Sequence, residues 1–151
     1  MPEKVAAVPS LLYLVKRLEL VIRSHLDEIL RDSGVTTPQY TALTVLAHRG
    51  AASAAQLARD SFVSPQSIAD LLRQLERRGL ISREPNPHSK RELLIRISDA
   101  GKDFLDEYAA PIAEVERLMI ANLSPTEVSH LRGMLLAGWS ALLPGASRSI
   151  P

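Results

Sequence analysis

Residues 53–62 read SAAQLARDSF, residues 63–84 read VSPQSIADLLRQLERRGLISRE, and residues 85–98 read PNPHSKRELLIRIS. This stretch contains two helix start signals: an S-x-x-Q capping box that opens at Ser53, and Ser64 followed by Pro65 at the first helical position. The second helix repeats its apolar residues at i, i+3, i+4 and i+7 and is expected to end at Gly79. Two short helices joined by a turn near Phe62 predict a helix-turn-helix.

The second of these helices has two chemically different faces. Its apolar face carries Ile68, Leu71, Leu72 and Leu75, and its outer face carries Gln66, Asp70, Arg73 and Arg77, with Ser67 and Gln74 beside them. Glutamine can pair with adenine, and arginine with guanine or phosphate, so this face suits a DNA major groove. An ordinary amphipathic surface helix also has a polar outer face, and that interpretation stays open for this helix taken alone.

A basic hairpin is expected directly after the helix-turn-helix. Residues 81–84 and 93–97 are rich in strand-forming side chains, whereas residues 85–91 are expected to form a loop because prolines remove ladder donors. Lys90 and Arg91 would lie at the tip of this loop, where they could contact the minor groove or the DNA backbone. The alternative is a solvated hairpin loop with ordinary surface charge.

The length of the chain and the distribution of its charge bear on this module. The chain has 151 residues, of which 46% are hydrophobic, so we expect one domain over 1–151 with a substantial core. The overall net charge is only +1. Residues 49–96, however, hold nine basic and five acidic side chains, a net charge of +4. The positive charge therefore lies on the segment that would neutralise phosphates.

Several other classes of protein are not indicated. The chain has no cysteine, and its four histidines lack metal-ligand spacing, so we expect neither a metal site nor a cofactor. It shows no glycine-rich phosphate loop, nucleophile elbow or clustered catalytic residues, and we do not expect an enzyme. The sequence shows no secretion signal and no apolar run of spanning length. We expect a cytoplasmic protein that does not enter a membrane.

The rest of the chain is expected to be helical. One helix is predicted over residues 9–33, another from Thr37 to Gly50, a long one from Ser98, and a last one from a capping box at Ser124. The predicted fold is mostly α with a small β-hairpin wing: a winged helix-turn-helix at about 35–97, with dimerisation helices at 9–33 and 98–143. The winged module cannot cover such long apolar helices alone, which favours a two-fold homodimer. A monomeric bundle with folded-back termini is the alternative.

The order of elements over about residues 10–143 resembles the MarR family of bacterial transcription regulators. The motifs that carry the resemblance are LDEILRDSGVTTPQYTALTVLA, SPQSIADLLRQLERRGLISR, the wing through ISDAG, and LSPTEVSHLRGML. The family's wing pattern is Asp, any residue, Arg, five residues and Leu-Thr, and it falls on Ser89, Arg91, Ile97 and Ser98. Arg91 is retained, but Ser89 replaces the acidic residue that would brace it. Asp70 stands where many members carry Arg or Lys.

The resemblance implies a mechanism. It implies a homodimeric repressor, less often an activator, that binds double-stranded DNA at a pseudo-palindromic operator, with DNA contacts from Ser64, Gln66 and Ser67. It also implies a small effector, often an aromatic acid or phenol, bound between the dimerisation helices and the winged module. The candidate residues there are Tyr13, Arg17, His25 and Tyr40. Ordinary half-buried surface positions are the alternative for these four.

A second functional class remains open. Asp70 and Ser89 both weaken the expected match to duplex DNA, and they favour a winged-helix module that binds a protein or RNA instead. Steeply salt-dependent binding to a pseudo-palindromic duplex would distinguish the DNA regulator from such a module.

Overall fold

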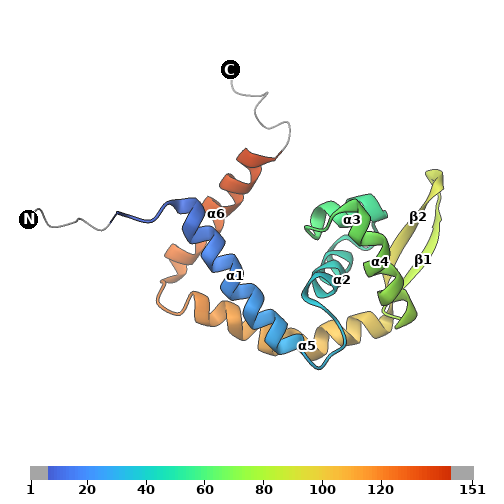
Figure 1. Ribbon diagram of the computed structural model, residues 1–151, viewed down its shortest axis with the longest axis horizontal. Helices are drawn as coiled ribbons and strands as arrows, with labels where there is room; N and C mark the ends of the chain where they lie inside the picture. The colour runs from blue at the N-terminus through green and yellow to red at the C-terminus, as the bar shows by residue number, and fades with distance from the viewer. Residues whose placement is uncertain (1–6, 144–151) are drawn as a thin grey trace, which may run out of the picture. The chain divides into compact units, whose positions relative to one another are not determined.

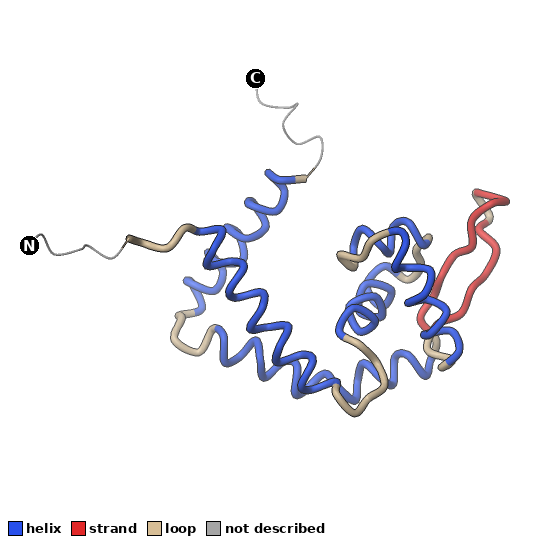
Figure 2. The backbone as a smooth tube through the Cα atoms, in the orientation of Figure 1, coloured by secondary structure: helices blue, strands red, loops and turns tan. Residues whose placement is uncertain are grey.

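The structure of the protein, a computed structural model, describes residues 7–143 (Figure 1). Within that range the elements are α1 (Leu11–Leu30), α2 (Thr37–Arg49), α3 (Ala54–Asp60), α4 (Pro65–Arg77), β1 (Ile81–Asn86), β2 (Ser89–Ile97), α5 (Asp99–Met119) and α6 (Pro125–Leu142). Figure 2 shows the hairpin, in red, as the strand-forming part of an otherwise helical chain. The predicted fold class, mostly α with a β-hairpin wing, is confirmed. No helix of the described residues is long and apolar enough to cross a membrane.

The predicted helix starts are confirmed at Ser53, Ser64 and Ser124. Each side chain accepts a hydrogen bond from the backbone N–H three residues later, and the boxes at Ser53 and Ser124 are closed by the side chain at that third position. A further box, which the sequence analysis did not identify, opens α2 at Thr36 and Gln39. These caps satisfy backbone donors that have no partner within the helix, so the start of each helix is fixed locally.

Leucine side chains from α2, α3 and α4 form the core of the winged module. The largest fully buried side chains are Leu43, Leu46, Leu57, Leu72, Leu75 and Ile95. The whole predicted apolar face of α4 is buried, and burial of each such side chain contributes about 1.5–3 kcal/mol. The opposite face of α4 is therefore directed away from the core.

The expected loop over residues 85–91 was wrong. Pro85 pairs with Leu93 and Asn86 with Ser89, so the strands continue almost to the tip and only Pro87 and His88 form the turn. Both strands of a two-stranded ribbon are edges, where a proline can lie with its missing donor directed outward. The register also shifts between Pro85 and Asn86, which is the kind of irregularity that accommodates proline in a strand.

The base of the wing is joined to the connection between α2 and α3. Ala52 exchanges two backbone hydrogen bonds with Ile95, of 3.1 and 2.9 Å. Both residues are buried. The wing is thus held to the helices by backbone pairing as well as by side-chain packing.

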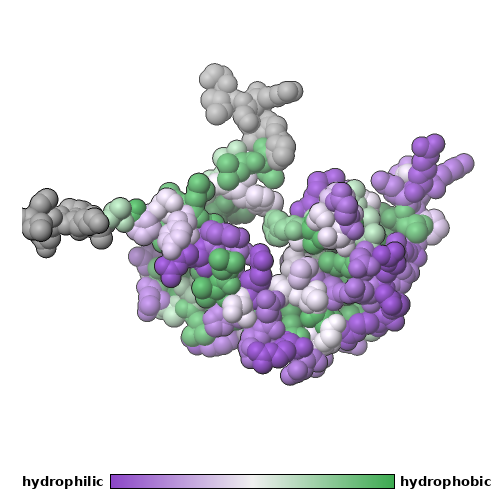
Figure 3. Space-filling view, in the orientation of Figure 1, coloured by the Kyte–Doolittle hydropathy of each residue, from purple (hydrophilic) through white to green (hydrophobic). Residues whose placement is uncertain are grey.

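The chain divides into two compact units between Ala113 and Glu114. In the first unit, α1 leaves a series of large apolar side chains exposed: Leu11, Leu12, Tyr13, Leu14, Val15, Leu18, Leu20 and Val21. In the second unit, α6 does the same with Met134, Leu135, Leu136, Trp139 and Leu142. Hydrophobic surface over α6 appears green in Figure 3, whereas the surface around α4 and the wing is largely purple.

Candidate nucleic-acid interface

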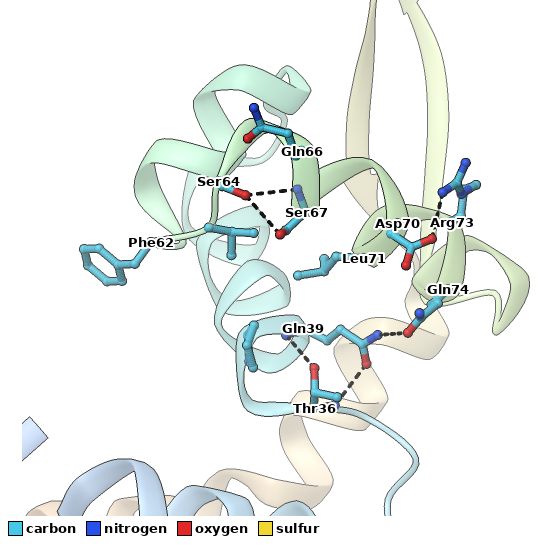
Figure 4. Close-up of a pocket in the computed structure, with 12 residues that line it drawn as sticks. Thr36, Gln39, Phe62, Ser64, Gln66, Ser67, Asp70, Leu71, Arg73 and Gln74 are labelled. Carbon is cyan, nitrogen blue, oxygen red and sulfur yellow. Dashed lines mark hydrogen bonds and ion pairs between the residues drawn. The ribbon is translucent and has the colours of Figure 1, made fainter. Parts of the chain in front are cut away.

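The first turn of α4 is organised by two serines. The Oγ of Ser64 accepts from the backbone N–H of Ser67 at 3.1 Å and lies 3.0 Å from the Oγ of Ser67 (Figure 4). Pro65 occupies the first helical position, where no N–H is needed. Gln66 follows with an exposed side chain. The exposed side-chain amide of Gln66 therefore lies in a first helical turn whose position is fixed by the cap.

The outer face of α4 is open to solvent along its length. Gln66, Asp70, Arg73 and Arg77 are all exposed, so no other part of the described chain covers this face. The Nη2 of Arg73 donates to the Oδ1 of Asp70 at 2.7 Å, with both side chains more than 60% exposed. An exposed pair of this kind contributes little to stability, but it does orient the guanidinium. The i, i+3 spacing in the sequence would have identified this pair.

Several cations of the basic segment have partners within the fold. Arg78 donates to the backbone oxygen of Ser33 at 2.9 Å, and Arg83 to Glu76 at 3.0 Å. In addition, Arg96 pairs with Glu84, and Arg49 with Asp60. Both partners of these ion pairs lie within residues 49–96, so the pairs cancel in the count and the net charge of +4 remains on the other cations of the segment. Lys90 and Arg91 of the wing are exposed and take part in no ion pair within the described residues.

Lys90 and Arg91 lie in β2 and not on a loop tip. The pairing with β1 passes from Leu93 directly to Ser89, so Lys90, Arg91 and Glu92 have no paired residue on β1. Both cations are exposed in this irregular part of the strand. Ser89, at the position of the expected acidic brace, is half-buried.

A surface depression lies beside α4, between the start of α2 and the turn of the helix-turn-helix. Its lining is Thr36, Pro38, Gln39, Phe62, Val63, Ser64, Gln66, Ser67, Asp70, Leu71, Arg73 and Gln74 (Figure 4). The predicted side chains Ser64, Gln66, Ser67, Asp70 and Arg73 are thus brought together. Phe62 and Gln39 are additions that the sequence analysis did not select. Exposed hydroxyls, amides and a guanidinium along one helix can donate to phosphates and to base edges.

The four candidate effector residues are not gathered in one place. Tyr13 and Arg17 are neighbours on α1, with the guanidinium carbon 5.7 Å from the centre of the ring. His25 is exposed on the same helix, about 18 Å beyond Tyr13 along the helix axis at 1.5 Å per residue. Tyr40 lies in α2 and packs against the core of the winged module. None of the four lines the depression beside α4.

Within residues 7–143, no group of three or more side chains of His, Cys, Asp or Glu is placed to hold a metal ion.

Comparison with known proteins gives one consistent result. A family model described as the MarR family matches residues 35–93. An HTH-type transcriptional repressor of Mycobacterium tuberculosis is 28% identical over 123 residues, which make up 82% of this chain and 88% of that protein. An HTH-type transcriptional regulator of Mycobacterium leprae is 33% identical over 99 residues, or 64% of this chain and 69% of that protein. Among solved structures, a MarR family transcriptional regulator from Silicibacter pomeroyi shares the fold, with a TM-score of 0.84 at 21% identity over 93% of this chain and 97% of that one.

Proposed function

This chain belongs to the MarR family of transcriptional regulators, and on that premise we propose that it is a homodimeric repressor of a pseudo-palindromic operator, released by a small ligand. It regulates transcription by binding DNA, as the family does, and it would do so in the cytoplasm. In this proposal α4 enters the major groove and the wing contacts the adjacent minor groove or backbone. The DNA contacts would come from Ser64, Gln66, Ser67, Asp70, Arg73, Arg77, Lys90 and Arg91.

One observation carries the proposal most of all: the outer face of α4 is exposed while its inner face is buried. Leu72 and Leu75 anchor the helix in the core, with exposed fractions of 1% and 0%. Gln66, Arg73 and Arg77 on the other side are free to approach a duplex. A recognition helix needs this combination of a rigid base and an accessible polar face.

The apolar side chains of α1 and α6 support dimerisation. Trp139 on α6 is 57% exposed and Leu12 on α1 is 78% exposed in the single chain. Exposed apolar residues concentrated on one helix indicate a protein contact surface, and α1 and α6 each carry such a set. A second copy related by a two-fold axis would cover them and would place two α4 helices about 34 Å apart, one turn of DNA.

An effector would act through the spacing of these two helices. Tyr13 and Arg17 supply an aromatic face and a cation side by side, which suits an aromatic acid. His25 and Tyr40 lie apart from this pair in the single chain, so Tyr13 and Arg17 are the part of the proposed site to test first. A ligand can release DNA only by its difference in affinity for the two spacings.

DNA binding is tested by selecting bound fragments from genomic DNA and measuring affinity for the enriched duplex against salt. We expect a pseudo-palindromic site, with log affinity falling by about 0.9 per phosphate contact for each unit of log salt concentration. Little duplex binding even at low salt, together with capture of RNA or a protein, would favour the other class of winged-helix module. Selected fragments that overlap promoters, and transcription from them that rises when the protein is absent, would support repression.

Dimerisation is tested separately by sedimentation velocity at micromolar concentration. The wild type is expected to sediment as a dimer, and Trp139→Glu as a monomer with weakened operator binding, because a charge on the covered face stays desolvated. His130→Glu introduces a charge at an exposed polar position of the same helix and is the control. A wild-type monomer at this concentration would contradict the proposed assembly.

A further inference from the structure

The buried side chain of Gln39 links the start of α2 to α4. The backbone N–H of Thr36 donates to the Oε1 of Gln39 at 3.0 Å, and the backbone N–H of Gln39 donates back to the Oγ1 of Thr36 at 3.3 Å. On its other side, the Nε2 of Gln39 donates to the Oε1 of Gln74 at 2.7 Å (Figure 4). Gln39 is only 4% exposed.

These contacts determine the orientation of the side-chain amides of Gln39 and Gln74. A backbone N–H can only donate, so the atom of Gln39 that faces Thr36 must be its oxygen. The NH₂ group of Gln39 must then face Gln74, and the atom of Gln74 that meets it must be an acceptor. Turning Gln39 over would set its NH₂ group against the backbone N–H of Thr36, two donors facing each other in a buried place, which is costly.

The amide of Gln74 is consequently oriented, with its carbonyl oxygen toward Gln39 and its NH₂ group directed outward. Its carbonyl oxygen is occupied by Gln39, and its NH₂ group is directed to no other atom of the described residues. The side chain is exposed and lines the depression beside α4, on the same side of the helix as Ser67 and next to Asp70. Gln66 differs, because no hydrogen bond within the described residues holds its amide in one orientation.

We propose that the capping box of α2, acting through Gln39, orients the amide of Gln74 so that its NH₂ group is the part offered to DNA. Its partner would be an acceptor: a phosphate oxygen, or the O6 and N7 of guanine or the O4 of thymine. The two-sided pair with adenine is disfavoured for Gln74, since that pair also needs the carbonyl oxygen, which already accepts from Gln39. This inference rests on the proposed function, in which α4 lies on duplex DNA.

Gln39→Glu tests the inference because it reverses the orientation of the Gln74 amide and keeps the capping box of α2. Glutamate is a standard closing residue of a capping box, so the carboxylate still accepts from Thr36. It cannot donate to Gln74, whose NH₂ group then turns inward and leaves the carbonyl oxygen outward. The donor offered to DNA becomes an acceptor.

Gln56→Glu is the matched control. Gln56 closes the capping box of α3 by the same two hydrogen bonds with Ser53, and its side chain makes no hydrogen bond with α4 within the described residues. The control carries the same change of charge, in the same kind of cap and in the same module. Any general repulsion of DNA by the added carboxylate is therefore measured independently.

The readout is operator selection with a randomised half-site, followed by affinity measurements for both variants and the wild type. If Gln74 meets a base, Gln39→Glu changes the preference at one position per half-site from guanine or thymine to adenine or cytosine, and Gln56→Glu does not. If Gln74 meets a phosphate, Gln39→Glu weakens binding to all sequences by about 3- to 10-fold more than the control does. Gln74→Met should reproduce that loss with the cap intact, and keeps the test decisive should Gln39→Glu fold poorly.

Equal behaviour of Gln39→Glu and Gln56→Glu in both affinity and preference would overturn the inference, as would wild-type affinity of Gln74→Met. Failure of the proposed function is distinguishable, because the wild type itself would then show no salt-dependent duplex binding.

Discussion

The Oγ of Ser98 donates to the backbone oxygen of Gly79 at 2.5 Å, and the backbone N–H of Ser98 donates to the oxygen of Leu80 at 3.0 Å. Ser98 immediately precedes α5, and Gly79 follows the end of α4. The same Oγ also accepts from the backbone N–H of Gly101 at 3.0 Å, which caps α5. The end of the recognition helix and the start of α5 are therefore connected by a short network of hydrogen bonds.

Gly101 is expected to be intolerant of a side chain. A Cβ at this position would lie 2.3 Å from the oxygen of Leu80 and 2.6 Å from the Cγ1 of Ile97, and neither neighbour can withdraw without moving the base of the wing. Gly101→Ala should lower the free energy of unfolding by about 1–3 kcal/mol or more, measured by urea unfolding at fixed protein concentration. Lys102→Ala, at the exposed next position, should change it by no more than about 0.5 kcal/mol. Equal stability of the two variants would contradict the close packing.

Local signals in the sequence were sufficient for the helix starts and for the two faces of α4. Ser53 and Ser64 act on backbone groups three residues away, and the 3.6-residue repeat assigns Leu72 and Leu75 to the core, so both features can be read within one window of sequence. The outer face of α4 followed from the same repeat.

Contacts between distant residues could not be read in this way. Gln39 meets Gln74 across 35 positions, and Ala52 pairs with Ile95 through backbone groups that every residue possesses. The position of Pro85 in a strand could not be read from the sequence. Proline is compatible with an edge strand, but only the pairing of β1 with β2 shows that both strands are edges. These features arise from tertiary packing, which local patterns do not specify.

Phe62 lies in the turn of the helix-turn-helix with a φ of 60° and is 84% exposed. This left-handed conformation costs a residue with a Cβ roughly 1–2 kcal/mol, and the exposed ring regains little of it by burial. Phe62→Gly should raise the free energy of unfolding by about 0.5–1 kcal/mol, after the larger chain entropy of glycine is deducted. Phe62→Ala keeps the Cβ and should show no gain. A gain of equal size for alanine would attribute the effect to the ring and not to the backbone.

Ser61 is buried at the end of α3, and its Oγ has no hydrogen-bond partner within the described residues. Removing a buried hydroxyl that makes no bond relieves its desolvation cost, so Ser61→Ala should leave stability unchanged or raise it by about 1 kcal/mol. Ser53→Ala is the matched comparison at the other end of α3. There the hydroxyl caps the helix, and its loss should cost about 1 kcal/mol. A destabilised Ser61→Ala in thermal or urea unfolding would indicate a partner for this hydroxyl.

Asp70 holds the guanidinium of Arg73 and places a negative charge on the outer face of α4. Asp70→Asn should strengthen binding to duplexes of unrelated sequence and steepen the salt dependence by about one unit, because Arg73 becomes available to a phosphate. Discrimination between the operator and unrelated DNA should fall. Asp106→Asn makes the same change of charge at an exposed position of α5 and should leave the salt slope unchanged. An unaltered slope for Asp70→Asn would mean that Arg73 does not approach the phosphates.

Lys90 and Arg91 are exposed neighbours in the part of β2 that has no partner on β1, and the wing pattern of the family retains Arg91 alone, so their removal should have unequal effects. Arg91→Ala should weaken operator binding for all sequences and reduce the salt slope by about one unit, as expected for one lost phosphate or minor-groove contact. Lys90→Ala removes the same charge from a position outside that wing pattern, and its effect should be clearly smaller. Fluorescence anisotropy with a labelled operator at several salt concentrations gives both quantities. Equal losses for the two variants would show that the wing acts as diffuse positive charge, and unchanged affinity for both would remove the wing from the mechanism.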